Sequence, residues 1–221
     1  MNGLKDMGLE NLKKSIENEF KNESTIFTIK PASIWIDEAK SRPIPKMLFG
    51  EFWFEGELCI LFADTNLGKS ILAVQIANSI CVGNSICGLK LECNPSPIIY
   101  FDFELSDKQF ENRYSENFKN HYQFNSNFLR AEINPDNEMP KIFQSFEDFL
   151  FYSLEQSVKN GSVKVLIIDN ITYLKNETEK AKDALPLMKF LKELKNKYSL
   201  SILALAHTPK RDLTRPQEAK C

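Results

Sequence analysis

The stretch Leu58–Ser70 reads LCILFADTNLGKS, and its second part, Ala63–Ser70, has the spacing of a phosphate-binding loop. The apolar run Leu58–Phe62 predicts a short strand that is buried on both faces of a sheet. After the loop, Lys69–Val82 predicts a helix, because apolar residues recur every four positions. A strand, a tight loop and a helix in this order favour a site for phosphate groups.

The residue types of the loop explain how it would hold a triphosphate. Successive main-chain N–H groups form a concave nest for the phosphate oxygens, and the dipole of the following helix points at the same place. Lys69 would place its charge on the β- and γ-phosphates, and Ser70 would offer its hydroxyl to Mg²⁺. The sequence therefore predicts ATP and Mg²⁺ as ligands. The predicted nucleotide-binding residues are Ala63, Asp64, Thr65, Asn66, Leu67, Gly68, Lys69 and Ser70.

One position departs from the usual loop pattern, because Ala63 stands where the first glycine is expected. A Cβ atom restricts positive φ angles, although alanine is the smallest replacement. Asn66, within the loop, tolerates left-handed geometry better than most residues. The alternative is an accidental GKS at a helix start, and the strand before and the helix after disfavour it.

Two acidic strand ends complete the predicted site. Asp169 follows the apolar run Val165–Ile168, so it would hold Mg²⁺ through water; the alternative is an aspartate that caps a turn. In Tyr100–Glu104, alternation puts Asp102 and Glu104 on one face, with Glu104 at the tip. Glu104 is therefore the candidate catalytic residue that positions water, and Asp102 would pair within the sheet. Alternatively, Glu104 is a favourable first-turn charge of the next helix.

The rest of the chain continues the alternation of strands and helices. Strands are expected at Pro97–Phe103, Phe128–Ile133, Val163–Ile168 and Leu200–Ala206, and helices at Ser106–Phe118, Lys141–Val158 and Lys182–Tyr198. Ser106 and Gln109 form a capping-box pattern, and the second helix is expected to bury Ile142, Phe146, Phe149 and Leu150. Such alternation predicts an α/β fold, a mostly parallel sheet with helices on both faces.

Composition limits the compartment and the partners. The net charge of −2 gives no global basic field, so any contact with nucleic acid needs a local patch. No apolar run is long enough for a bilayer and the N-terminus lacks a secretory pattern, so we expect a cytoplasmic protein without membrane contact. The five cysteines show no metal-site spacing and are expected to be reduced thiols.

Taken together, these segments resemble the RecA-like P-loop ATPase family, in particular RepA- and DnaB-like hexameric helicases and AAA-type ATPases of bacterial mobile elements. The resemblance rests on Ala63–Ser70, on FDFEL (Phe101–Leu105), on LIIDN (Leu166–Asn170) and on LALAHTPKR (Leu203–Arg211). DnaB-type helicases also carry alanine at the first loop position. The resemblance implies a RecA-like core with the strand order 3-2-4-5-1 and a homo-hexamer as the assembly.

The same resemblance implies roles for single residues. Glu104 is similar to the family's catalytic glutamate and His207 to its sensor, although His207 is also compatible with an ordinary loop histidine. Lys210, Arg211 and Arg215 are similar in place to a DNA-contacting loop, and a solvated tail is the alternative.

The resemblance also sets the expected domain organisation. We expect a polar arm over residues 1–30, a lead-in segment over 31–57 and the ATPase core over 58–221. Family members carry further strands and an arginine finger beyond the matching part, so a C-terminally truncated core is expected.

Three functions are compatible with these motifs. The first is an ATPase that acts on DNA in replication or mobile-element transfer. The alternative is a truncated or regulatory ATP-binding module with little hydrolysis of its own. A small-molecule kinase is disfavoured, because the sequence between Glu104 and Asp169 contains only Arg113 and Arg130 and no arginine-rich lid.

Overall fold

The structure is a computed structural model that describes residues 27–134, 136–171 and 181–208. The chain forms two compact units, Met1–Ile44 and Pro45–Cys221. The described part of the first unit contains helix α2 (Ala32–Ala39). Lys30 contacts this helix through an ion pair and a cation–π contact. Its Nζ lies 2.9 Å from Glu38 Oε2 and 4.9 Å from the centre of the Trp35 ring. Trp35 itself is 42% exposed.

A five-stranded parallel sheet organises the second unit. Its strands are β1 (Leu58–Ala63), β2 (Ile98–Asp102), β5 (Phe128–Ala131), β6 (Val165–Asp169) and β7 (Ser201–His207). They lie in the order β1-β7-β6-β2-β5, and every pairing is parallel. Numbered along the chain and read from the β5 edge, this order is 3-2-4-5-1. The predicted strand order is therefore confirmed.

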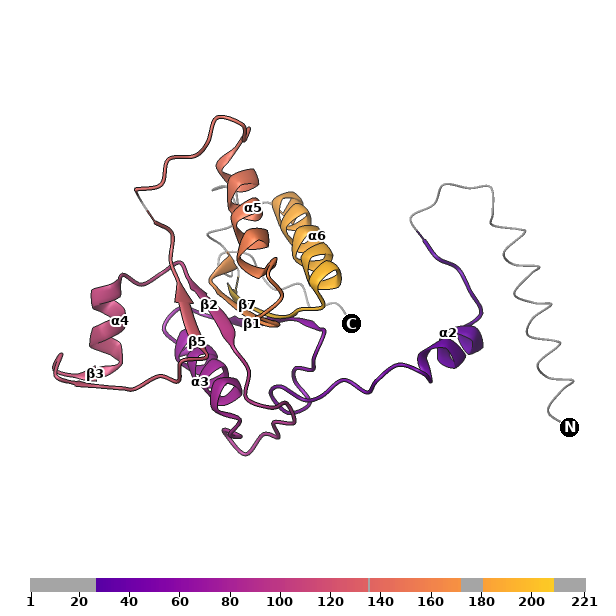
Figure 1. Ribbon diagram of the computed structural model, residues 1–221, viewed down its shortest axis with the longest axis horizontal. Helices are drawn as coiled ribbons and strands as arrows, with labels where there is room; N and C mark the ends of the chain where they lie inside the picture. Colours follow the sequence, from indigo (N-terminus) through magenta and orange to yellow (C-terminus); the bar gives the residue numbers. More distant parts are fainter. Residues whose placement is uncertain (1–26, 135, 172–180, 209–221) are drawn as a thin grey trace, which may run out of the picture. The chain divides into compact units, whose positions relative to one another are not determined.

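Helices cover both faces of the sheet (Figure 1). Helix α3 (Lys69–Val82) lies on one face, while α5 (Phe146–Val158) and α6 (Ala181–Tyr198) lie on the other. Alternate residues of β2 face these two layers: Tyr100 packs in the core under α3, and Phe101 packs in the core under α5 and α6. This arrangement confirms the predicted α/β fold.

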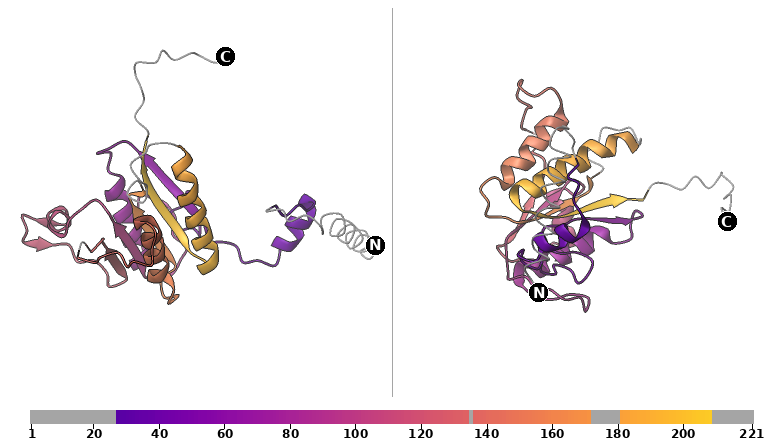
Figure 2. Two further views of the ribbon diagram at one scale, coloured as in Figure 1. Left: turned by 90° about the horizontal axis from the view of Figure 1, so that it is seen from above. Right: turned by 90° about the vertical axis from the view of Figure 1, so that its right-hand side faces the viewer.

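The apolar run of β1 alone predicts burial on both faces, whereas the strand order 3-2-4-5-1 puts this strand at an edge, and the structure agrees with the strand order. Strand β1 lies at the edge of the sheet beside β7 (Figure 2), and its residues are half-buried, with Phe62 56% exposed. In the described part of the chain, β7 is the only strand that pairs with it. A run of apolar residues cannot distinguish an edge strand from a central one, because strand order is a property of the whole fold.

Helix α4 (Asp107–Arg113) is shorter than the expected helix over Ser106–Phe118. Its start agrees with the sequence, since the Ser106 side chain accepts the Gln109 N–H in a capping box. The chain then turns into a small antiparallel hairpin of β3 (Ser115–Glu116) and β4 (Asn120–His121). Asn117 and Phe118 form this turn with positive φ angles, which are incompatible with a right-handed helix.

Helix α5 also starts later than expected, at Phe146 instead of Lys141. The side chain of Ser145 caps it by accepting the N–H of Asp148. The buried row consists of Leu150, Leu154 and Val158, while Ile142 is 83% exposed and Phe146 is 53% exposed. The predicted inward positions of Ile142 and Phe146 are therefore wrong. The Ser145–Asp148 spacing is the sequence signal that fixes the true start.

The segment before β1 packs with the sheet. Leu48 N donates to Trp53 O at 2.9 Å, and both side chains are buried in the core under α3, Trp53 at 1% exposure. The second unit, which contains the sheet, begins at Pro45.

Two further observations concern the cysteines and the lengths of the helices in the described residues. Cys59, Cys81, Cys87 and Cys93 are free thiols, and the described residues contain no cluster of three or more His, Cys, Asp or Glu side chains that would suit a metal ion. None of the helices in these residue ranges has the length and apolar character needed to cross a bilayer.

Candidate functional site

The predicted site residues meet at one end of the sheet because all five strands are parallel. Ala63 and His207 are paired neighbours at the ends of β1 and β7. Asp102 and Asp169 are paired in the same way at the ends of β2 and β6. Because side chains alternate along a strand, Tyr100 and every second residue of β2 point to the sheet face that α3 covers. Helix α3 follows the loop Ala63–Ser70. That loop is called the phosphate loop below.

Two residues of the phosphate loop have left-handed backbone geometry. Gly68 has a φ of +81° and is the N-cap of α3, and Asn66 has a φ of +65°. Ala63 ends β1 and is not among the residues with positive φ. The loop therefore does not require glycine at position 63, and the left-handed geometry falls on Asn66, which tolerates it.

The phosphate loop is exposed to solvent. A Cβ atom built on Gly68 would meet no heavy atom within 4 Å. Residues 64–67 are exposed, and the main-chain N–H groups at the start of α3 have no helical partner of their own. An exposed loop at a helix N-terminus suits a phosphate group.

Lys69 is the buried cation of the loop, with 8% of its surface exposed. Its Nζ donates to Ala63 O at 2.8 Å and to Asp64 O at 3.0 Å, and lies 3.2 Å from His207 Nδ1. These partners are neutral acceptors rather than a carboxylate. Within the described part of the chain the ammonium group is therefore held in place without an ion pair, and its charge remains available to an anionic ligand.

His207 connects the phosphate loop to the acidic residues. The Lys69 ammonium can only donate, so its contact with His207 Nδ1 is a hydrogen bond in the tautomer that leaves Nδ1 without a proton. His207 Nε2 is 3.4 Å from Glu104 Oε1, and Thr65 Oγ1 lies 3.5 Å from Nδ1. A single imidazole therefore touches the loop lysine and the candidate catalytic carboxylate.

Glu104 lies just beyond the end of β2, with 32% of its side chain exposed. Asn170 Nδ2 donates to Glu104 Oε1 at 2.7 Å, so the residue after Asp169 holds this carboxylate. Both Asn170 and His207 use Oε1, and no described residue bonds to Oε2. The bonds to Oε1 fix the orientation of the carboxylate, and Oε2 remains available to a water molecule.

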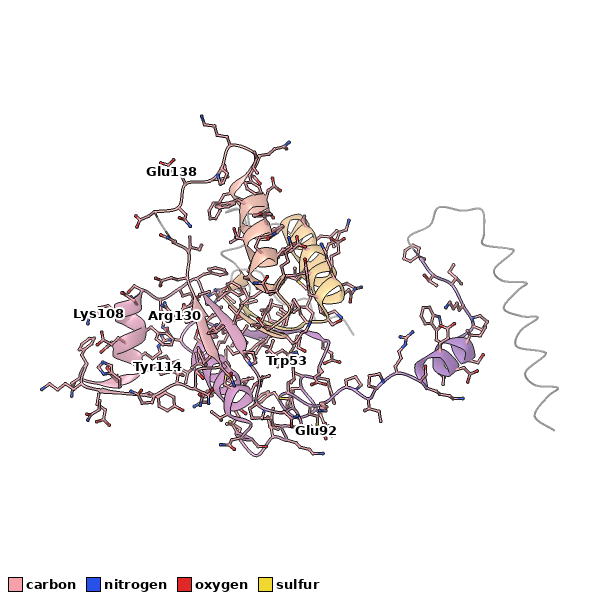
Figure 3. All side chains as sticks on the ribbon, in the orientation of Figure 1. Trp53, Glu92, Lys108, Tyr114, Arg130 and Glu138 are labelled. Atoms are coloured by element: carbon pink, nitrogen blue, oxygen red, sulfur yellow. The ribbon has the colours of Figure 1, made fainter. Side chains whose placement is uncertain are left out.

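Asp102 pairs within the sheet, as its deeper position suggested. Its side chain is 1% exposed, and Arg130 Nε on β5 donates to Oδ2 at 3.0 Å. Oδ1 accepts the N–H groups of Glu104 and Leu105 at 3.2 and 3.0 Å. Arg130 lies on the side of the sheet that carries α4 (Figure 3), 4.8 Å from the centre of the Phe110 ring. These bonds fix the turn that carries Glu104.

Asp169 has the environment of a cation ligand. It is 2% exposed, its Oδ2 accepts the Tyr100 hydroxyl at 2.5 Å, and its Oδ1 is buried without a partner among the described residues. Burial raises the pKa of Asp169 above its ordinary value, while the nearby hydroxyls of Ser70 and Tyr100 oppose that rise. An unpartnered buried carboxylate oxygen near a serine hydroxyl fits Mg²⁺, because a cation would satisfy the oxygen and favour its charged form.

The structure thus brings together Lys69, Ser70, Glu104, Asp169 and His207. The predicted DNA-contacting residues Lys210, Arg211 and Arg215 lie outside the described residues. Sequence reasoning missed the roles of Tyr100, Asn170 and Arg130. Tyr100 and Asn170 stand inside or beside the quoted motifs, whereas the contact of Arg130 with Asp102 has no local signal.

A known protein family matches most of the chain. The model of this family, which is described as an AAA domain (AAA_25), matches residues 25–212. Among curated proteins, none matches the chain.

Proposed function

Because the chain belongs to the AAA domain family of ATP-binding ATPases, we propose that it binds ATP in the phosphate loop and hydrolyses it with Glu104. The observation that carries the proposal is the convergence at one sheet end of a buried lysine, a carboxylate oxygen with no partner in the described residue ranges and an accessible glutamate. These groups would bind the phosphates, the metal ion and the attacking water respectively.

Lys69 and the loop N–H groups would bind the triphosphate. In the structure, Lys69 Nζ donates to two main-chain carbonyls of the loop. An anionic phosphate is a stronger acceptor than a carbonyl, so the ammonium would move to it at little cost. His207 Nδ1 would then lose its lysine partner, which links phosphate binding to the group beside Glu104.

Ser70 and Asp169 would hold Mg²⁺, the usual partner of ATP in this family. When bound, this ion neutralises charge on the phosphates. Glu104 would orient a water molecule and accept its proton, with Asn170 holding the carboxylate in position.

We also propose that DNA is a binding partner of this ATPase. This proposal is supported by the family resemblance and by the sequence, in which Lys210, Arg211 and Arg215 follow His207 within eight positions. A residue that senses the γ-phosphate would then stand next to a segment that contacts DNA. Assembly into a ring is proposed on the same resemblance.

Phosphate release by the purified chain tests the proposal. We expect Mg²⁺-dependent ATP hydrolysis that single-stranded DNA stimulates, with a salt-sensitive effect. Hydrolysis without any response to DNA would contradict the DNA part alone. Tight ATP binding with negligible turnover would favour the alternative, a regulatory nucleotide-binding module.

A further inference from the structure

Tyr100 lies in the middle of β2, fully inside the protein, with 1% of its surface exposed. Across the sheet it pairs with Ile167 on β6, two residues before Asp169. Residues that are offset by two on neighbouring strands share a face, and a long aromatic side chain can span that diagonal. The Tyr100 hydroxyl does so, and it lies 2.5 Å from Asp169 Oδ2.

The ring of Tyr100 is held by other aromatic rings. It lies 5.9 Å from the ring of Phe128 on β5, which in turn lies 4.8 Å from the ring of Phe124. Tyr114 extends this cluster on the side of the sheet that carries α4 (Figure 3), 5.2 Å from Phe124. A close-packed ring cannot change its direction without disturbing its neighbours, so the hydroxyl stays where Asp169 needs it.

A phenylalanine at position 100 would fill the core equally well, so the hydroxyl requires its own explanation. A buried hydroxyl costs free energy unless it has a partner. Here its partner is a carboxylate with two oxygens, one bonded to Tyr100 and the other without a partner among the described residues. The hydroxyl therefore restrains the rotation of the carboxylate, because it holds Oδ2.

We propose that Tyr100 is a positioning residue of the magnesium site, which holds Asp169 so that Oδ1 is presented to the ion. This inference rests on the proposed function. Tyr100 would not touch the metal or the nucleotide and would act only through Asp169. Partners of this kind typically change metal affinity by about 10- to 100-fold when they are removed.

The test is a magnesium titration of fluorescent ADP binding by the full chain, read as the Mg²⁺ concentration at half-maximal change. Tyr100→Phe removes only the hydroxyl, and we expect it to raise this concentration about tenfold or more. ADP affinity without Mg²⁺ should equal that of the unmodified chain, which also serves as the check that the variant is folded. Tyr198→Phe is the matched control. It removes a tyrosine hydroxyl at the end of α6 that donates to a carboxylate oxygen, Glu155 Oε1 on α5, at 2.8 Å.

Several results would overturn the inference. An unchanged magnesium midpoint in Tyr100→Phe would do so while leaving the proposed function intact, provided that the unmodified chain shows a magnesium effect. If Tyr100→Phe weakens ADP binding by the same factor without Mg²⁺ as with it, the hydroxyl has a packing role instead. A further shift caused by Tyr100→Phe in an Asp169→Asn background would show that the hydroxyl does not act through Asp169. If the unmodified chain binds no ADP, the inference and the proposed function fail together.

A second measurement keeps the hydroxyl and does not depend on the folding of Tyr100→Phe. Fluorotyrosine is placed at position 100, and its fluorine NMR signal is followed as Mg²⁺ is added to the ADP complex. A signal that moves with the magnesium midpoint supports the inference. A signal that stays fixed while Mg²⁺ binds contradicts it.

Discussion

The phosphate loop and the acidic half of the site, at the ends of β2 and β6, meet at one end of the sheet but are built differently. The loop follows an edge strand, and its residues 64–67 are exposed. The acidic half lies on inner strands, where Asp102, Asp169 and Asn170 are 3%, 2% and 1% exposed. Main-chain groups form the first half, and buried side chains with fixed partners form the second.

This difference predicts how each half tolerates substitution. A nest of main-chain N–H groups depends on φ angles, so most of its side chains can change without loss. A buried network depends on each partner, because a group left without one incurs its full desolvation cost. Substitutions in the acidic half should therefore affect stability as well as chemistry, and those in the loop should affect ligand binding alone.

The largest effect is expected for Glu104→Gln, which keeps the shape of the side chain but removes the base. We expect ATP hydrolysis to fall about 100- to 10,000-fold while ATP binding is retained. Phosphate release and fluorescent ATP titration measure the two quantities. Glu116→Gln is the matched control, because Glu116 lies on the β3–β4 hairpin, where its carboxylate accepts from Asn120 Nδ2. Equal hydrolysis by Glu104→Gln and the unmodified chain would remove Glu104 from the mechanism.

Arg130→Met tests whether the acidic half is held by side chains. It leaves Asp102 Oδ2 buried without its cation, and we expect the free energy of unfolding in urea to fall by about 3 kcal/mol. Two N–H donors remain on Oδ1, so the loss should stay near the lower end for buried pairs. Lys108→Met breaks an exposed pair with Glu111 and should cost much less, because solvent screens that pair. Similar losses in the two variants would show that burial does not matter here.

Lys69→Ala tests the one loop side chain whose charge is required. We expect ATP binding to weaken by about 1.5 to 3 kcal/mol, the range of charge-assisted hydrogen bonds, as measured by fluorescent ATP titration. Lys164→Ala is its matched control, because Lys164 Nζ also donates to a main-chain carbonyl, that of Tyr198, but stands before β6 at the other end of the sheet. An unchanged affinity in Lys69→Ala would place the phosphates elsewhere.

The smallest effects concern the two loop positions where glycine is usual. Gly68→Ala forces a Cβ onto a φ of +81°, so ATP affinity should fall by about 1 to 2 kcal/mol, although the space around it is open. Ala63→Gly should leave the affinity unchanged within about 0.5 kcal/mol, because Ala63 does not need left-handed geometry. Isothermal titration of both variants measures the contrast. A clear gain in affinity for Ala63→Gly would contradict our account of the loop.

Much of the fold could be predicted because its signals are local. The run Leu58–Phe62 and the GKS motif locate β1 and the start of α3, and Ser106 with Gln109 marks the start of α4. The burial of β1 and the inner face of α5 could not be predicted in this way. Both depend on which elements become neighbours, and apolar residues such as Phe62 and Ile142 carry no information about that.

The candidate site shows the same limit. The sequence predicts Lys69, Glu104 and Asp169 because each lies within a motif or at the end of a strand. The bond from Arg130 to Asp102 joins residues 28 positions apart, and the bond from Tyr100 to Asp169 joins residues 69 positions apart. Such contacts become visible only when strand order and register are known.

Each of the two compact units contains one of the two tryptophans of the chain, Trp35 in the first and Trp53 in the second. Trp35 is 42% exposed and Trp53 is 1% exposed, so the two indoles differ strongly in their contact with water. Intrinsic fluorescence therefore carries a separate optical reporter for each unit. Iodide should quench the red-shifted emission of the first and leave the blue-shifted emission of the second, so unfolding of the sheet can be followed without an added dye.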